Sequence, residues 1–271
     1  MATKKPSSSS ASKPTKPATA KAESAKNWQP TAEAKGKATQ LRIIAFILWL
    51  VAIGLEAFTI FWVLPRPALG DAATPDGSAS TIFMVVLIGA IVVIGVIALI
   101  GSLMWKKAGR LDPPSEANKV TFFLKTQLGV IMTLIAFVPL IILIFLNKGM
   151  SKNQKTLAGI VGIVVLLLVG VGSADLAPVS SEDMGNQTDS AISAIGSDSV
   201  YWVPGGNVYH YCSDYNGKII PAFSRSDVTT ITNGTVAEAV AANKKRPSMY
   251  AYSECGLTEG SVAELPTDQP S

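Results

Sequence analysis

The sequence predicts an all-α integral membrane bundle of four spans, with a disordered basic N-terminal tail and a small α+β soluble domain at the C-terminus. Of 271 residues, 48% are hydrophobic and only 15% are charged, and the mean hydropathy is +0.35. Soluble proteins carry about 25% charged residues. The apolar residues are also concentrated in long runs between residues 42 and 174, and the polar stretch 175–271 follows them.

The composition excludes several classes of protein. Two cysteines cannot form the framework of a disulfide-dense secreted scaffold. A single histidine excludes a multi-histidine metal centre or a haem bundle. We therefore expect no resident cofactor.

Residues 1–41 form a low-complexity tail rich in Ala, Lys, Ser, Pro and Thr, with eight lysines against Glu23 and Glu33. Such a segment cannot bury enough apolar surface to offset its ordering entropy, so we expect it to be disordered. Its lysines could hold anionic lipid, at roughly 1 kcal/mol per lysine near the surface. A solvated tail is the simpler interpretation, and we expect no nucleic-acid partner although such basic arms can bind one.

Four apolar segments are each long enough to cross a bilayer. About 20 residues at 1.5 Å rise span a hydrocarbon layer of about 30 Å. None of the segments shows the polar face of a buried helix in a soluble core. The predicted spans are 43–64, 80–105, 126–147 and 156–174.

The distribution of Lys and Arg predicts that the N-terminus is cytoplasmic. The tail with Arg42 offers nine Lys/Arg and the segment 105–125 offers five, whereas the loop between the first two spans has Arg66 alone. The positive-inside rule then makes the first two spans a hairpin.

The third segment leaves two topologies open, because lysines flank it on both sides. In one, all four segments span and the C-terminal domain is cytoplasmic. In the other, the third segment is a re-entrant hairpin that turns at Pro139, where a helix loses one donor, and the domain lies outside. Lipid-exposed irregular backbone is not tolerated, so we favour four full spans.

The C-terminal region divides into an acidic linker (175–199), a small α+β domain (200–256) and a disordered end (257–271). Residues 200–203 and 208–211 flank the turn residues Pro-Gly-Gly-Asn and predict a hairpin. Thr235 and Glu238 have the spacing of a capping box, which predicts a short helix that ends before Pro247.

Glu56 is the only charged residue within the four predicted spans. An ionised carboxylate at that depth is unfavourable, so Glu56 is expected to be protonated, hydrogen-bonded across the bundle, or in contact with water. It is a candidate proton or cation site. The simpler interpretation is a polar contact between helices.

His210, Cys212 and Cys255 are the only soft-ligand residues of the small domain. They are weak candidates for a metal site, because the paired C-x-x-C spacing of zinc sites is absent. A Cys212–Cys255 disulfide would close a loop of about 42 residues and stabilise the domain. It would also require an oxidising compartment, whereas two free thiols would fit a cytoplasmic domain, so both states remain open.

Three stretches of the chain resemble one known group. They are VYWVPGGNVYH (200–210), NGTVAEAVAA (233–242) and ECG (254–256), and GSAD (172–175) precedes them. The pattern is similar to that of uncharacterised multi-span membrane proteins of Gram-positive bacteria with a C-terminal module reading VYW-x-PGG-x-YH, SGTVxEA and CxxCG. The resemblance implies a module with a small metal knuckle and no assigned activity. Here Tyr252 stands where the first cysteine of CxxC belongs, which favours loss of the knuckle.

The sequence contains no nucleophile–base set, carboxylate pair or phosphate-binding glycine loop, so no catalytic residue is predicted. We expect a non-enzymatic protein of the cell membrane whose acidic domain binds a protein partner, self-associates or docks on its own bundle. The alternative is a small transporter or channel-like protein that uses Glu56.

Overall fold

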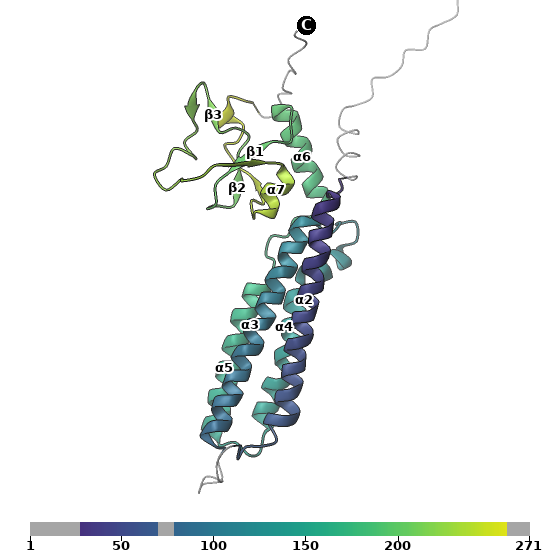
Figure 1. Ribbon diagram of the computed structural model, residues 1–271, viewed down its shortest axis with the longest axis vertical. Helices are drawn as coiled ribbons and strands as arrows, with labels where there is room; N and C mark the ends of the chain where they lie inside the picture. Colours follow the sequence, from purple (N-terminus) through teal and green to yellow (C-terminus); the bar gives the residue numbers. More distant parts are fainter. Residues whose placement is uncertain (1–27, 70–78, 259–271) are drawn as a thin grey trace, which may run out of the picture.

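The computed structural model describes residues 28–69 and 79–258. Long helices form a bundle, and a small strand-containing region covers one end of it (Figure 1). The bundle helices are α2 (Ala32–Phe58), continued by the π-helix η1 (Thr59–Val63), α3 (Thr81–Leu111), α4 (Lys119–Leu146) and α5 (Lys152–Ser173). All four are long and apolar enough to cross a membrane, which confirms the number of predicted spans.

The helices extend beyond the predicted spans into polar sequence. Helix α2 begins at Ala32, so the part of the predicted disordered tail from residue 32 to 41 is helical. The Thr31 hydroxyl accepts the Ala34 amide at 3.2 Å as an N-cap, and Glu33 pairs with Lys37 one turn along. Residues 1–27 of the predicted tail and the end 259–271 lie outside the described residues.

The third segment is one continuous helix, so the re-entrant alternative is wrong. Helix α4 runs from Lys119 to Leu146 with Pro139 inside it. Proline removes one backbone donor, but the apolar sequence on both sides continues the helix, and neighbouring helices pack against its buried face.

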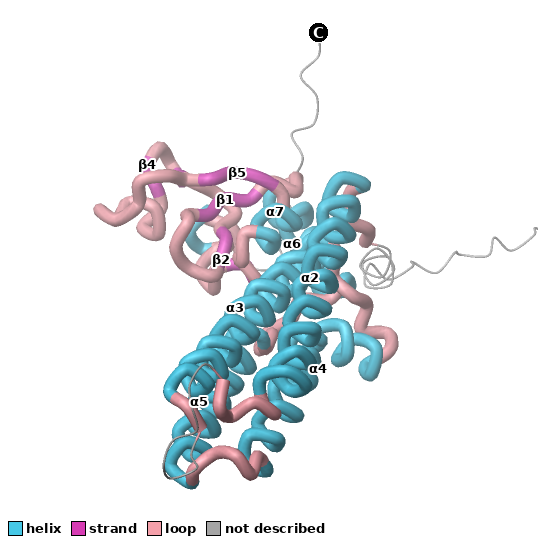
Figure 2. The backbone as a smooth tube through the Cα atoms, turned by 60° about the horizontal axis from the view of Figure 1, so that its bottom comes forward, coloured by secondary structure: helices cyan, strands magenta, loops and turns pink. Residues whose placement is uncertain are grey.

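The four helices pack around a common apolar core and expose apolar side chains outward. Phe83 and Leu87 of α3 and Phe137 and Leu140 of α4 are fully buried in this core. In contrast, Leu168 on α5 is 68% exposed, although it is equally apolar. A bundle that is apolar inside and outside is typical of helices surrounded by lipid. Figure 2 shows the helices running side by side along one long axis.

The segment 175–199, predicted as a linker, contains helix α6 (Ser181–Ile195). Ser180 and Asp183 form a capping box at its start, and Gly196 ends it in the left-handed conformation with φ of 74°. Met184 and Ala191 are buried in the core of the small domain. The prediction of a linker failed because an acidic helix with few large apolar residues has a weak local pattern.

The small domain contains short strands in three two-stranded pairs. Strand β1 pairs antiparallel with β5, β2 pairs parallel with β6, and β3 pairs antiparallel with β4. Helix α7 and the 3₁₀-helix η2 complete it. The bounds are β1 (Val200–Trp202), β2 (Val208–Tyr209), β3 (Asp214–Tyr215), β4 (Lys218–Ile219), β5 (Thr232–Gly234), α7 (Val236–Ala241), β6 (Arg246–Pro247) and η2 (Ser253–Cys255).

The predicted hairpin is present only as a single bridge. Tyr201 and His210 exchange two backbone hydrogen bonds of 2.8 Å, but β1 and β2 otherwise pair with strands much later in the chain. The predicted capping box is confirmed: Thr235 Oγ1 accepts the Glu238 amide at 3.2 Å, and Glu238 Oε2 accepts the Thr235 amide at 2.8 Å. Helix α7 ends before the residue Asn243, which adopts a φ of 69°.

Lys244 holds the turn that separates β1 from β2. Its side chain is 1% exposed, and its ammonium donates to the carbonyls of Pro204, Gly205 and Gly206 at 3.0, 3.0 and 2.7 Å. Burial lowers the pKa of Lys244. This side chain connects the end of α7 to the Pro-Gly-Gly turn, and nothing in the local sequence pattern marks it.

The small domain is docked on the end of the bundle where α2 begins (Figure 1). Lys245 Nζ contacts Asp175 Oδ1 at 3.2 Å and donates to the carbonyl of Ala177 at 2.8 Å. The Ser181 amide donates to the Pro114 carbonyl at 3.2 Å in the α3–α4 connection. The start of α2 and the C-terminal domain therefore lie at the same end of the four spans.

Candidate cationic pocket at the end of the bundle

A pocket of about 470 Å³ lies where the bundle meets the small domain. Its walls come from the segment before α2, the ends of α2 and α3, the α3–α4 connection, the start of α4, the α5–α6 connection and the start of α6. We call it the junction pocket. Its charged lining residues are Arg42, Lys106, Arg110, Lys125, Asp112, Asp175 and Glu182.

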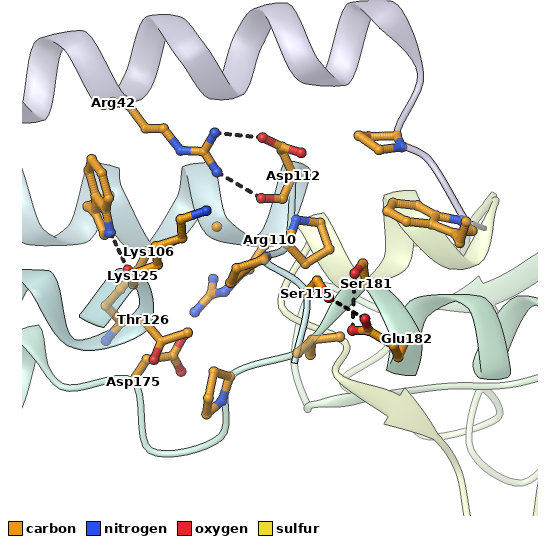
Figure 3. Close-up of a pocket in the computed structure, with 18 of the residues that line it drawn as sticks. Arg42, Lys106, Arg110, Asp112, Ser115, Lys125, Thr126, Asp175, Ser181 and Glu182 are labelled. Atoms are coloured by element: carbon orange, nitrogen blue, oxygen red, sulfur yellow. Dashed lines mark hydrogen bonds and ion pairs between the residues drawn. The ribbon is translucent and has the colours of Figure 1, made fainter. Parts of the chain in front are cut away.

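Each carboxylate of the junction pocket is already engaged by the protein. Arg42 contacts Asp112 Oδ2 at 2.6 Å and donates to the Asp112 carbonyl at 2.8 Å. Asp175 pairs with Lys245. Glu182 accepts from the Ser115 hydroxyl and from a backbone amide of the α3–α4 connection (Figure 3).

Two of the four cations are not engaged. The side chains of Arg110 and Lys125 make no hydrogen bond or ion pair within the part of the chain that the structure describes, and the Nε of Arg110 is buried without a partner. A buried polar group without a partner costs about 1–3 kcal/mol, and more when it is charged. The buried Nε of Arg110 is therefore an unsatisfied donor of the pocket, and the exposed Lys125 adds a second positive charge that an anion could approach.

Lys106 connects the pocket to the end of α5. Its ammonium donates to the carbonyls of Gly172 and Ala174, both at 3.0 Å. The last carbonyls of a helix lack intrahelical partners, and a cation there also interacts favourably with the helix dipole. In Figure 3, Lys106 and Arg110 lie below the Arg42–Asp112 pair, and Glu182 lies to their right.

Glu182 fixes α6 to the α3–α4 connection. Partial burial would raise the pKa of this carboxyl, but hydrogen bonds from the Ser115 hydroxyl and the Glu116 amide outweigh it, so the pKa is lower than usual. Glu182 is therefore ionised at neutral pH, and its oxygens already accept hydrogen bonds from donors of the protein.

An apolar groove of about 320 Å³ on α2 adjoins the junction pocket. Arg42 and Trp105 line both cavities. We call it the α2 groove, and its other lining residues are Thr39, Ile43, Phe46, Ile47 and Leu50. The guanidinium of Arg42 lies 5.9 Å from the centre of the Trp105 ring, at the boundary between the two.

The structure places Glu56 inside the bundle and far from this pocket. It is 4% exposed, and its Oε1 has no hydrogen-bond partner among the described residues. The backbone of Leu140 in α4, next to Pro139, is its polar neighbour. Neither the junction pocket nor the α2 groove is lined by Glu56.

The structure brings the three soft-ligand candidates together, but not as a metal site. Cys212 and Cys255 form a disulfide, with their Cα atoms 5.9 Å apart. His210 Nδ1 contacts Glu254 Oε2 at 2.7 Å, and its ring packs edge-on against Phe223. Within residues 28–69 and 79–258 no group of three or more His, Cys, Asp or Glu is arranged to hold a metal. The disulfide and the His210–Glu254 contact both connect the segment after β2 to η2.

Arg110 and Lys125 were overlooked as site residues by the sequence analysis, which used them only to infer orientation. The signal that could have identified them is their position. Arg110 follows the second long uncharged segment by a few residues and Lys125 immediately precedes the third, so both lie at the same end of the bundle. Their convergence with the start of α6 depends on domain docking, which has no local sequence signal.

Comparison with protein families, with curated proteins and with solved structures finds no match for this chain.

Proposed function

We propose that this chain is a non-enzymatic membrane protein whose small acidic domain docks on its own bundle and thereby completes a binding pocket for a phosphate-type anion. The observation that supports this most directly is the pair of unengaged cationic side chains, Arg110 and Lys125, in a pocket whose carboxylates are all engaged by ion pairs or hydrogen bonds within the protein. Arg presents several donors in a fixed fork that matches phosphate oxygens, and Lys adds a compact charge.

Binding of glycerol phosphate to the full-length protein in a neutral detergent tests this proposal. The pocket is lined by Trp28 and Trp105, so tryptophan fluorescence is a suitable readout. We expect Arg110→Gln to weaken binding about tenfold or more, because a hydrogen bond to a charged group contributes about 1.5–3 kcal/mol.

The matched control is Lys107→Gln, because Lys107 is exposed on the same helix and does not line the pocket. Binding that is equal in the wild type and Arg110→Gln would overturn the proposal. A loss in both Arg110→Gln and Lys107→Gln would also contradict it, since the effect would then follow from net charge.

For the orientation, we propose that the domain end of the bundle is cytoplasmic. Lys and Arg are concentrated at this end, which the positive-inside rule places in the cytoplasm. In the described residues they are Lys35, Lys37, Arg42, Lys106, Lys107, Arg110, Lys119 and Lys125, against Arg66, Lys148, Lys152 and Lys155 at the other end. The Cys212–Cys255 disulfide is the observation that opposes this orientation, because the cytoplasm keeps most thiols reduced.

Thiol labelling in cells distinguishes a cytoplasmic domain from an external one. With the domain end cytoplasmic, we expect a membrane-impermeant thiol reagent to label neither Cys212 nor Cys255 in intact cells, before or after an impermeant reductant. After permeabilisation and reduction of the disulfide both should react. The control is Lys148→Cys in a variant lacking both native cysteines, which should react in intact cells. Labelling of the native pair in intact cells after reduction would place the domain outside.

A further inference from the structure

We infer that the anion bound in the junction pocket is the headgroup of an anionic phospholipid, and that one acyl chain of this lipid lies in the α2 groove. This inference rests on the proposed function and specifies its ligand. It follows from the way in which the two cavities meet, from the position of the groove on the membrane-facing side of α2, and from the charge at their boundary.

The two cavities form one continuous surface with a polar and an apolar part. Arg42 and Trp105 line both of them. Arg42 is held in place by Asp112, and Trp105 by a 2.7 Å hydrogen bond from its Nε1 to the Lys125 carbonyl. A ligand that reaches from one cavity to the other must therefore be charged at one end and apolar at the other.

The groove follows α2 toward the interior of the membrane. Its residues Ile43, Ile47 and Leu50 recur at helical spacing on one face and are 57%, 54% and 61% exposed. From Arg42 to Leu50 the helix rises about 12 Å at 1.5 Å per residue, which is a large part of one leaflet. Exposed isoleucine and leucine at this depth face hydrocarbon, so the occupant of the groove is an acyl chain.

The charge pattern favours an anionic lipid over a zwitterionic one. Arg110 and Lys125 lack partners among the described residues, so the pocket accommodates a phosphate. The ammonium of a zwitterionic headgroup would find no free carboxylate in the pocket, because those present are engaged by Arg42, Lys245 and Ser115. Arginine and lysine pockets between spans at this boundary suit anionic headgroups.

Lipid retention tests the inference. The full-length protein is reconstituted in vesicles of equal phosphatidylglycerol and phosphatidylcholine and re-extracted in neutral detergent, and the co-purified lipids are quantified. We expect phosphatidylglycerol to be enriched about tenfold over phosphatidylcholine in the wild type. Arg110→Gln, which removes the headgroup contact, and Ile47→Trp, which fills the groove, should each abolish this enrichment.

Two matched variants should retain the enrichment. Ile142→Trp introduces the same bulk on α4 at a residue that is 52% exposed and lines neither cavity. Lys107→Gln removes one positive charge beside the pocket. All variants should elute as the wild type in size-exclusion chromatography, because each changed side chain faces lipid, solvent or the pocket.

The outcomes separate the lipid from a free phosphate. Equal retention of the two lipids, or an enrichment that Ile47→Trp leaves unchanged, would overturn the lipid inference. If glycerol phosphate then still bound in an Arg110-dependent way, the anion pocket would stand and its ligand would be a soluble phosphate. If neither glycerol phosphate nor phosphatidylglycerol depended on Arg110, both the inference and the proposed function would be wrong.

Discussion

Replacing Lys244 with methionine is expected to accelerate hydrogen exchange of the Tyr201 and His210 backbone amides by at least about thirtyfold. The buried ammonium donates to three carbonyls of the Pro-Gly-Gly turn, and the loss of such charge-assisted hydrogen bonds costs about 2–4 kcal/mol in total. Methionine keeps the packing of the stem and leaves no buried charge behind. Because a domain of this size has only a few kcal/mol of stability, opening of the β1–β2 bridge should become frequent.

The measurement uses the full-length protein in a bilayer, with exchange followed at residues 200–210. Lys218→Met is the matched control, because Lys218 is exposed in β4 of the same domain. Exchange that is unchanged in Lys244→Met would mean that the turn is held without its ammonium. Exchange raised equally in both variants would point to a general effect of lost charge.

Gly95→Leu is expected to separate α3 from α5 and to lower the free energy of unfolding of the bundle by about 3 kcal/mol or more. A Cβ at Gly95 would lie 2.5 Å from Val165 Cγ1, 3.4 Å from the Phe137 ring and 3.5 Å from Val169 Cγ2. Valine side chains in helices have one strongly preferred rotamer, so Val165 cannot turn away without strain. The helices must move apart, and the tight packing of α3 against α4 and α5 is lost.

Gly89→Leu is the control, and its effect on the free energy of unfolding is expected to have the opposite sign. It lies on the same helix, and a Cβ there would meet nothing within 4 Å. Leucine has a higher helix propensity than glycine by about 1 kcal/mol, so this variant should be neutral or slightly more stable. Unfolding of both proteins by sodium dodecyl sulfate, followed by circular dichroism, measures the difference. Equal stability of the two variants would show that the α3–α5 approach contributes little.

The sequence predicts the bundle well because membrane spans depend on local composition. A helix that crosses lipid needs about 20 consecutive apolar residues, and this requirement is visible without any partner. The same composition cannot distinguish Gly95, which packs against α5, from Gly89, which faces outward. The predicted spans are also shorter than the helices, because the first turns of α2 are polar and those of α4 are interrupted by Lys119 and Lys125.

The small domain was predicted less well because its contacts are distant in sequence. The Thr235–Glu238 capping box is local and is confirmed. The partners of β1 and β2, in contrast, are β5 and β6, and strands of two or three residues have too little pattern to indicate their pairing. In the sequence, Lys244 is one of two adjacent lysines. Only the folded domain places its ammonium against the carbonyls of residues 204–206.

The junction pocket could not be predicted because its lining residues come from several separate segments of the chain. Its charged residues come from α2, α3, α4, α6 and the α3–α4 and α5–α6 connections, and Glu182 joins the others only when the small domain is docked. The sequence did identify the basic residues that flank the spans. It could not indicate that the carboxylates would be engaged within the protein and that the side chains of Arg110 and Lys125 would be left without partners.

Because one wall of the junction pocket belongs to the docked domain, ligand affinity and domain docking are thermodynamically linked. A ligand that binds the complete pocket more tightly than an open one shifts the equilibrium toward docking, and docking raises the affinity for the ligand by the same factor. A protein that pulled α6 away from the α3–α4 connection would break the Glu182–Ser115 contact. The affinity for the ligand would then fall by the factor by which docking had raised it. By this reciprocity, ligand occupancy at the membrane boundary sets how readily the domain is available to a partner.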